Sequence, residues 1–145
     1  MVQVGDKIVF EECMMFIFKW EDGYVNDPND SGGETKYGIC KRWYPHLDIK
    51  NLTREDAMKI YYDEYWLKAG CDKMLYPANL IIFDSAVHMG VYRALSLWED
   101  GITWHEYIFR RIECYTSMPS AKYYLRGWIN RCIDLWKEVK RKGAY

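Results

Sequence analysis

Apolar residues recur at helical spacing over the first 20 positions of the chain. Those that fall on one helical face are Phe10, Cys13, Met14, Ile17 and Trp20. Asp22 and Gly23 follow directly and interrupt the pattern. The spacing therefore predicts an amphipathic helix over residues 7 to 20 that ends near Trp20 or Glu21.

The next stretch is polar and rich in turn-forming residues. Pro28 fixes one backbone dihedral, whereas Gly32 and Gly33 permit positive ones. The segment TKYGI, residues 35 to 39, has the character of a short strand. We therefore expect a small hairpin-like excursion over residues 24 to 40.

Helical patterns fill the rest of the chain. Thr53 and Asp56 form a capping-box-like start. Behind them one apolar face extends to about residue 69, and its members are Met58, Tyr61, Tyr62, Tyr65 and Trp66. The apolar run 77 to 90 predicts a buried helix ended by Gly90, and residues 91 to 100 predict one or two further helical turns.

The last third predicts two more helices. Thr103 and Glu106 form a second capping box for a helix over residues 104 to 117. Pro119 suits the first turn of a long helix that runs to about Lys142, before Gly143. The expected fold is mainly α, with a small β-hairpin-like insertion after the first helix.

Composition fits one globular domain. The 145 residues are 50% hydrophobic and 17% aromatic, so a sizeable core can be buried. The five cysteines (Cys13, Cys40, Cys71, Cys114 and Cys132) include no CxxC pair, which argues against a disulfide framework or a zinc motif. Residues 101–145 carry 9 Lys and Arg against 4 Asp and Glu. This excess of positive charge is compatible with binding to an anionic polymer, or simply with a solvated helix face.

The sequence lacks the marks of a membrane span or a signal peptide. No apolar run approaches roughly 18 residues, and Glu11 and Glu12 interrupt the apolar N-terminal segment. We expect synthesis in the cytoplasm, and we expect no cofactor, no metal and no nucleic-acid partner.

Residues 19 to 39 combine five acidic side chains with four glycines. An EF-hand calcium loop beginning at Asp27 would need Glu at its twelfth position, where Gly38 stands. A pair of carboxyl groups with different environments fits better. Glu21 falls at the C-terminal end of the predicted helix, whose partial negative charge disfavours an ionised carboxylate, and nearby aromatic residues would exclude water.

A protonated carboxyl near neutral pH is what cleavage of a glycosidic bond requires. Asp30 lies on the polar loop and should stay ionised, and the Thr35 hydroxyl can help to hold a water. The alternative is that this acidic, glycine-rich stretch is only a solvated surface turn.

The segment WEDGYVNDPNDSGGETKYGI resembles the N-terminal motif of the glycoside hydrolase family 108 muramidases, which are lysozyme-like. The matching positions are Glu21, Gly23, Tyr24, Asn26, Asp27, Pro28, Asp30, Gly32, Gly33, Thr35, Gly38 and Ile39. Asp22 stands where the family usually has Gly, and Ser31 replaces a frequent Pro. The resemblance implies that Glu21 is catalytic, with Asp30 and Thr35 as carboxylate and water-positioning hydroxyl.

Three later segments extend the resemblance. YYDEYWLKAGCDKM is similar to a family helix with the pattern Tyr-x-x-x-Tyr-Trp. LIIFDSAVHMG is similar to the family's buried helix, with His88 in place of Asn, and FRRIECYTSMPSAKYYLRGWINRC is similar to its C-terminal peptidoglycan-binding-like segment. The implied organisation is a catalytic region over residues 1–95 and a helical peptidoglycan-binding-like region over residues 96–145, packed into one globular domain. The implied substrate is bacterial peptidoglycan, reached through a holin or an export system.

Several side chains are candidates for substrate binding. They are Tyr24, Asp27, Tyr37, Tyr65, Trp66, Arg126, Trp128 and Arg131. The alternative for the helical aromatics is the core, and for the arginines a solvated face. Asp84 lies in an apolar helix, so we expect it to be paired with an Arg or Tyr rather than catalytic. The competing function is a non-catalytic wall-binding or secretion-accessory module on the same scaffold.

Overall fold

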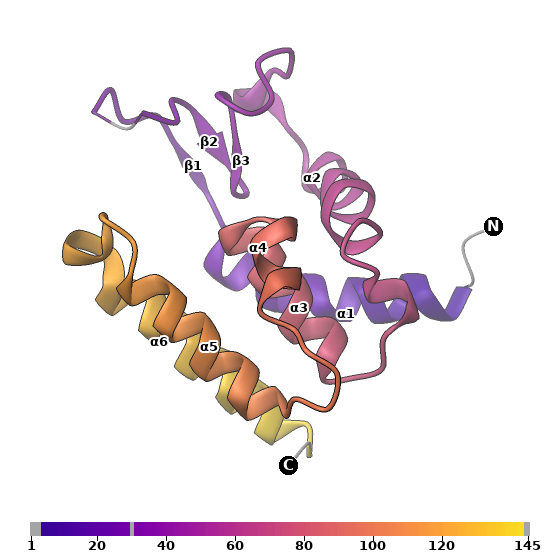
Figure 1. Cartoon of the computed structure of the whole chain (residues 1–145). Helices are drawn as coiled ribbons and strands as arrows, with labels where there is room; N and C mark the ends of the chain where they lie inside the picture. The colour runs from indigo at the N-terminus through magenta and orange to yellow at the C-terminus, as the bar shows by residue number, and fades with distance from the viewer. Residues whose placement is uncertain (1–3, 30, 144–145) are drawn as a thin grey trace. The chain divides into compact units, whose positions relative to one another are not determined.

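The computed structural model describes residues 4–29 and 31–143. Figure 1 follows the chain through α1 (Val4–Trp20), the strands β1 (Tyr24–Val25), β2 (Thr35–Lys36) and β3 (Ile39–Cys40), and then α2 (Arg54–Tyr61). The remaining α-helices of the described residues are α3 (Ala78–Met89), α4 (Val91–Ser96), α5 (Trp104–Thr116) and α6 (Ala121–Arg141). The mainly α fold expected from the sequence is confirmed.

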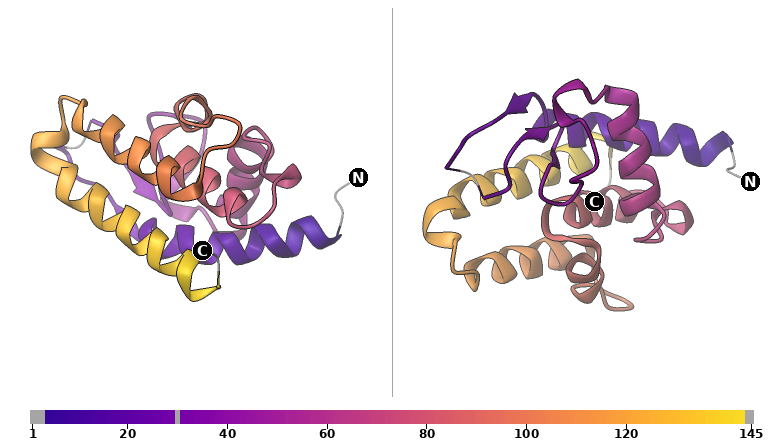
Figure 2. Two further views of the ribbon diagram at one scale, coloured as in Figure 1. Left: turned by 60° about the horizontal axis from the view of Figure 1, so that its bottom comes forward. Right: turned by 90° about the horizontal axis from the view of Figure 1, so that it is seen from above.

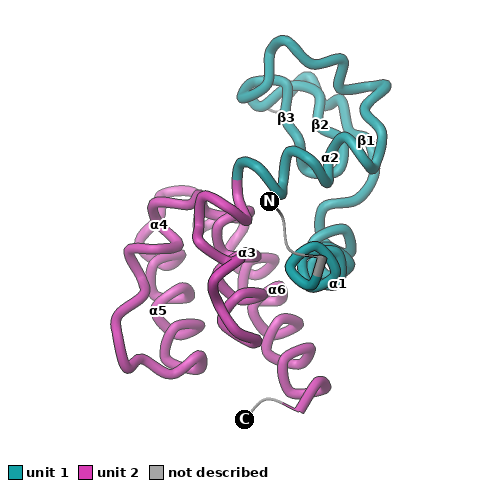
Figure 3. The backbone as a smooth tube through the Cα atoms, turned by 90° about the vertical axis from the view of Figure 1, so that its right-hand side faces the viewer, with its two compact units in different colours: residues 1–64 teal, residues 65–145 magenta. Residues whose placement is uncertain are grey.

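The chain forms two compact units, residues 1–64 and residues 65–145 (Figure 3). The first unit contains α1, the three strands and α2, and the second contains α3 to α6. The functional division expected near residue 95 stays a prediction. None of the helices in the described part of the chain is long and apolar enough to cross a membrane.

Helix α1 begins earlier than expected and ends where predicted. Its predicted inner face is buried at Phe10, Cys13, Met14 and Ile17, whereas Trp20 is half-buried. Apolar burial on this scale is what holds a helix in place in a small unit. The residue after its end is Glu21.

The insertion after α1 is a three-stranded antiparallel sheet in the order β1-β2-β3, rather than a single hairpin. Tyr24 pairs with Lys36 and Val25 with Thr35, while Thr35 pairs in turn with Cys40. The predicted strand at residues 35 to 39 is thus two strands joined by a turn at Tyr37 and Gly38.

Helix α2 begins with the predicted capping box. The Thr53 hydroxyl accepts from the Asp56 N–H at 3.1 Å, and the Asp56 carboxylate accepts from the Thr53 N–H at 3.1 Å. The helix ends at Tyr61, however, and the chain continues as a π-helical segment, Tyr62–Trp66. A single helix to residue 69 is therefore wrong.

In the second unit, α3 is buried along its length from Asn79 to Ala86, as its apolar sequence predicts, and Gly90 ends it with a positive φ of 92°. Figure 2 shows α5 and α6 lying side by side. The Thr103 hydroxyl caps α5 by accepting from the Glu106 N–H at 3.1 Å. Pro119 precedes α6 rather than lying in its first turn.

Candidate active site

Glu21 occupies the C-terminal end of α1. Its N–H still donates to the carbonyl oxygen of Ile17 at 2.8 Å, so the helical hydrogen bonding continues to this residue. The residue is half-buried. Glu21 is therefore held at a fixed helix end, and it is neither in the core nor fully in solvent.

The turn between β2 and β3 lies against this helix end. Tyr37 and Gly38 both have positive φ, 52° and 79°, as a two-residue type I′ hairpin turn requires. The N–H of Tyr37 donates to the carbonyl oxygen of Gly23 at 3.1 Å. The Tyr37 ring also contacts Phe18 edge-on, with centroids 5.7 Å apart. These contacts tie the turn to α1 and to the residues that follow it.

Gly38 has no space for a side chain. A Cβ at this position would lie 3.0 Å from Oε2 of Glu21 and would overlap the hydroxyl of Tyr61. Glycine is thus required here both by its positive φ and by the close approach of two side chains. The turn brings backbone within contact of the Glu21 carboxyl.

The other predicted residues of this region lie on the strands and loops of the first unit. The Tyr24 hydroxyl donates to Oε2 of Glu34 at 2.7 Å, a bond that raises the pKa of Tyr24. Asp27 is exposed and accepts from the N–H of Asn29 at 2.9 Å. Thr35 is half-buried on β2. Asp30 lies outside the described residues.

The expectation that no metal binds stays a prediction. Across residues 4–29 and 31–143, no three His, Cys, Asp or Glu side chains form a group that could hold a metal ion. Gly38 serves the turn beside Glu21 instead of occupying a ligand position.

The predicted substrate-binding residues of the second unit differ in exposure. Trp66 is fully buried and packs edge-on against Phe83, with ring centroids 5.2 Å apart. This burial favours its alternative assignment to the core. Tyr65 is half-buried, Arg126 is exposed, and Trp128 is half-buried with its ring 5.0 Å from that of Tyr115.

Arg131 is neither solvated nor open to a substrate, because it is 4% exposed and is paired with Asp84. Its Nη2 donates to Oδ1 of Asp84 at 2.8 Å, and Nη1 of Arg111 donates to Oδ2 at 2.8 Å. Burial alone would raise the pKa of Asp84, but the two guanidinium groups outweigh it and lower that pKa to about 2. The predicted structural pairing of Asp84 is confirmed.

His88 is half-buried in the second unit. Its Nδ1 is hydrogen-bonded to the Tyr115 hydroxyl. Burial, aided by the positive charges of Arg131 and Arg111, lowers the pKa of His88 to about 3. The imidazole is therefore neutral at physiological pH and is part of the polar network around Asp84.

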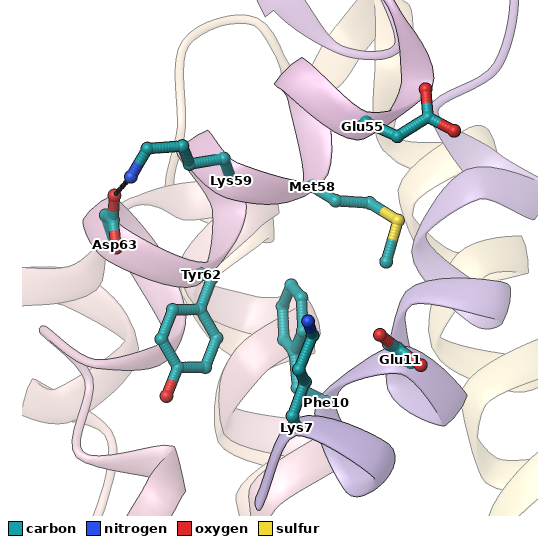
Figure 4. A pocket seen from close by; sticks show the side chains of 8 residues that line it. All are labelled: Lys7, Phe10, Glu11, Glu55, Met58, Lys59, Tyr62 and Asp63. Atoms are coloured by element: carbon teal, nitrogen blue, oxygen red, sulfur yellow. Dashed lines mark hydrogen bonds and ion pairs between the residues drawn. The ribbon is translucent and has the colours of Figure 1, made fainter. Parts of the chain in front are cut away.

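A groove of about 500 Å³ lies between α1 and α2, lined by Lys7, Phe10, Glu11, Glu55, Met58, Lys59, Tyr62 and Asp63 (Figure 4). Lys59 and Asp63 form an ion pair of 2.7 Å across one side of it. Glu11 precedes Glu21 by ten residues on the same helix axis, a separation of roughly 15 Å. This groove is thus distinct from the surroundings of Glu21.

Two contacts of these residues do not follow from the sequence. The Tyr61 hydroxyl lies beside the Gly38 turn and donates to the carbonyl oxygen of Tyr37 at 2.7 Å. Arg111 is a partner of Asp84. An apolar helical face places Tyr61 in the interior, and an apolar surrounding requires a partner for Asp84, but the identity of each partner depends on tertiary contacts.

Comparison with known proteins shows which family the chain belongs to. The family model described as glycosyl hydrolase 108 matches residues 14–90, which is more than half of the 145-residue chain. Among solved structures, SagA of Brucella abortus is similar over 93% of this chain and 95% of its own, with a TM-score of 0.79 at 23% identity. No curated protein matches the chain. The fold is thus lysozyme-like, as expected, and the chain belongs to the glycosyl hydrolase 108 family, a family of glycosidases.

Proposed function

We propose that the protein is a peptidoglycan hydrolase, an N-acetylmuramidase that cleaves the β-1,4 bond between N-acetylmuramic acid and N-acetylglucosamine. Family membership supports a glycosidase. The observation that carries the assignment of the acid is the position of Glu21, a half-buried residue directly after α1 whose carboxyl lies against the Gly38 turn.

In the proposed reaction, protonated Glu21 donates its proton to the glycosidic oxygen as the bond from the muramic acid C1 to that oxygen breaks. Positive charge develops on the sugar ring, and Asp30 stabilises it or takes a proton from the attacking water. Thr35, whose half-buried position is fixed by pairing with Val25 and Cys40, helps to hold that water. We favour water attack over a covalent intermediate. The Thr35 hydroxyl can position a water, but it would have little role if a carboxylate attacked the sugar directly.

Substrate contacts in the first unit come from the segment that follows Glu21. We propose that Tyr24 and Tyr37 stack on pyranose rings and that Asp27 accepts sugar hydroxyls. Tyr24 is 40% exposed, so its ring face is accessible. For the second unit, Tyr65, Arg126 and Trp128 stay candidates for contacts with the glycan or its stem peptides, whereas Trp66 and Arg131 are buried.

Release of the enzyme to the cell wall is part of the proposal. Synthesis in the cytoplasm would require a holin, a dedicated export route or cell lysis before peptidoglycan is reached. The proposed partners are therefore peptidoglycan and such a release system.

Digestion of purified cell walls tests the function. A muramidase leaves new reducing ends that are muramic acid, which borohydride reduction and mass analysis identify. New reducing glucosamine would show a glucosaminidase instead. Binding to walls without any new reducing end would favour the non-catalytic wall-binding or secretion-accessory module. The configuration of the newly formed anomer, followed by NMR before it mutarotates, separates inversion from retention.

A further inference from the structure

We propose that Tyr61 is a positioning residue for the proposed acid: its hydroxyl fixes the Tyr37–Gly38 turn against Glu21. This inference rests on the proposed function of Glu21. Tyr61 is the last residue of α2 and is only 1% exposed, so its ring is held rigidly by packing.

The hydroxyl of Tyr61 is used in a defined direction. It donates to the carbonyl oxygen of Tyr37 at 2.7 Å. A phenol has a single proton, so its remaining capacity is that of an acceptor. Toward any other neighbour, the oxygen of Tyr61 offers only lone pairs.

Glu21 is such a neighbour. The Tyr61 hydroxyl oxygen and Oε2 of Glu21 both lie within 3.0 Å of the point that a Gly38 Cβ would occupy. Glycine leaves this space free, and the two oxygens approach the turn from α2 and from the end of α1. The turn therefore contacts both side chains at one point, so the hydrogen bond from Tyr61 helps to set how closely the turn approaches the carboxyl.

Tyr61 also sets where the turn lies. The turn is held at Tyr37 by three groups: the Tyr61 hydroxyl, the Gly23 carbonyl at 3.1 Å and the Phe18 ring. Only the first of these comes from α2. Loss of the Tyr61 hydroxyl would therefore loosen the turn on the side that faces the carboxyl, while the contacts with the α1 end remain.

The test compares Tyr61→Phe with Tyr62→Phe. Both substitutions remove one part-buried hydroxyl from adjacent positions, but Tyr62 donates to Oδ2 of Asp6 at 2.8 Å, at the far end of α1. We expect Tyr61→Phe to lower kcat on purified walls by about 10- to 100-fold with little change in KM, because small misplacements of catalytic groups have effects of this size. Tyr62→Phe should keep kcat within about 2-fold, the scatter expected of a change outside the site.

The kinetics per folded molecule supply a readout that a purely structural role would not move. Loss of folded protein would lower the apparent kcat only in proportion to the folded fraction, which urea unfolding measures. A displaced turn beside Glu21 lowers kcat per folded molecule and leaves KM nearly unchanged.

The outcomes are distinguishable. Equal kcat in the two variants, corrected for their folded fractions, in an active wild-type background would overturn the role of Tyr61 alone. A wild-type protein that produces no new reducing ends would overturn the proposed function, and the role of Tyr61 with it.

Discussion

Asp84 and Arg111 form a salt bridge of 2.8 Å in which neither side chain is exposed to solvent. Arg131 binds the other carboxylate oxygen. The single negative charge of Asp84 is therefore paired with two guanidinium groups within the second unit. Removal of one member of such a group leaves uncompensated buried charge, which costs far more than the loss of an exposed pair.

The first prediction concerns this buried group. Asp84→Asn keeps the side-chain shape but leaves Arg111 and Arg131 without their anion, and should lower the free energy of unfolding by about 3–5 kcal/mol. Urea titration at neutral pH measures it. The control is Asp63→Asn, which breaks the exposed pair with Lys59 and should cost at most about 1 kcal/mol. Equal effects of the two substitutions would contradict the structure.

The second prediction concerns pH. Because the pKa of His88 is lowered to about 3 in the folded protein and is about 6.5 in an unfolded chain, the unfolded state binds an extra proton between these values. Stability should therefore fall with decreasing pH through this window, by up to about 1.4 kcal/mol per pH unit from this residue. Below pH 3 or so, the pKa of His88 in the folded protein, this loss of stability is complete.

His88→Asn isolates this contribution. The variant has no group that titrates at position 88, so its stability should vary less than that of the wild type between about pH 6.5 and about pH 4. Urea unfolding at several pH values gives the comparison. Parallel curves for the two proteins would mean that His88 is not held neutral by its surroundings.

The third prediction separates steric contact from backbone conformation. Gly38 and Gly70 have nearly the same φ, 79° and 74°, but a Cβ at Gly70 would meet nothing within 4 Å. Ala at either position should cost about 1–2 kcal/mol for the left-handed conformation. Gly38→Ala should cost a further 1–3 kcal/mol or so for overlap with Tyr61 and Glu21.

Wall hydrolysis should distinguish the same two variants. Gly38→Ala should lose most of its activity even where it is folded, because the turn must move away from Glu21. Gly70→Ala, corrected for its folded fraction, should keep its activity. A Gly38→Ala protein that is as active as Gly70→Ala would show that the turn does not shape the site.

Local features of the fold were predictable because their causes are local. The capping box of Thr53 and Asp56 and the helix stop at Gly90 each depend on residues a few positions apart. The end of α1 at Trp20 was equally clear from Asp22 and Gly23. The position of Glu21 at a helix end therefore followed from the sequence.

Features that depend on distant partners were not predictable. Arg111 and Arg131 follow Asp84 by 27 and 47 residues, and both lie on other helices. The strand pair β2–β3 needs Tyr37 at a positive φ, which a non-glycine residue adopts only when its surroundings hold it there. The contact of Tyr61 with this turn belongs to the same class.

The most direct test of the central claim is a comparison of two substrates with the Glu21→Gln variant. Glutamine cannot donate the proton, so hydrolysis of purified walls should fall by about 10²–10⁴-fold or more. An aryl glycoside of the same sugars, whose phenol leaves as a stable anion, needs no proton and should be cleaved by Glu21→Gln at nearly the wild-type rate. Glu12→Gln, at an exposed position on α1, serves as the control. A Glu21→Gln protein that hydrolyses walls like this control, or that loses both substrates equally, would contradict the role of Glu21 as the general acid.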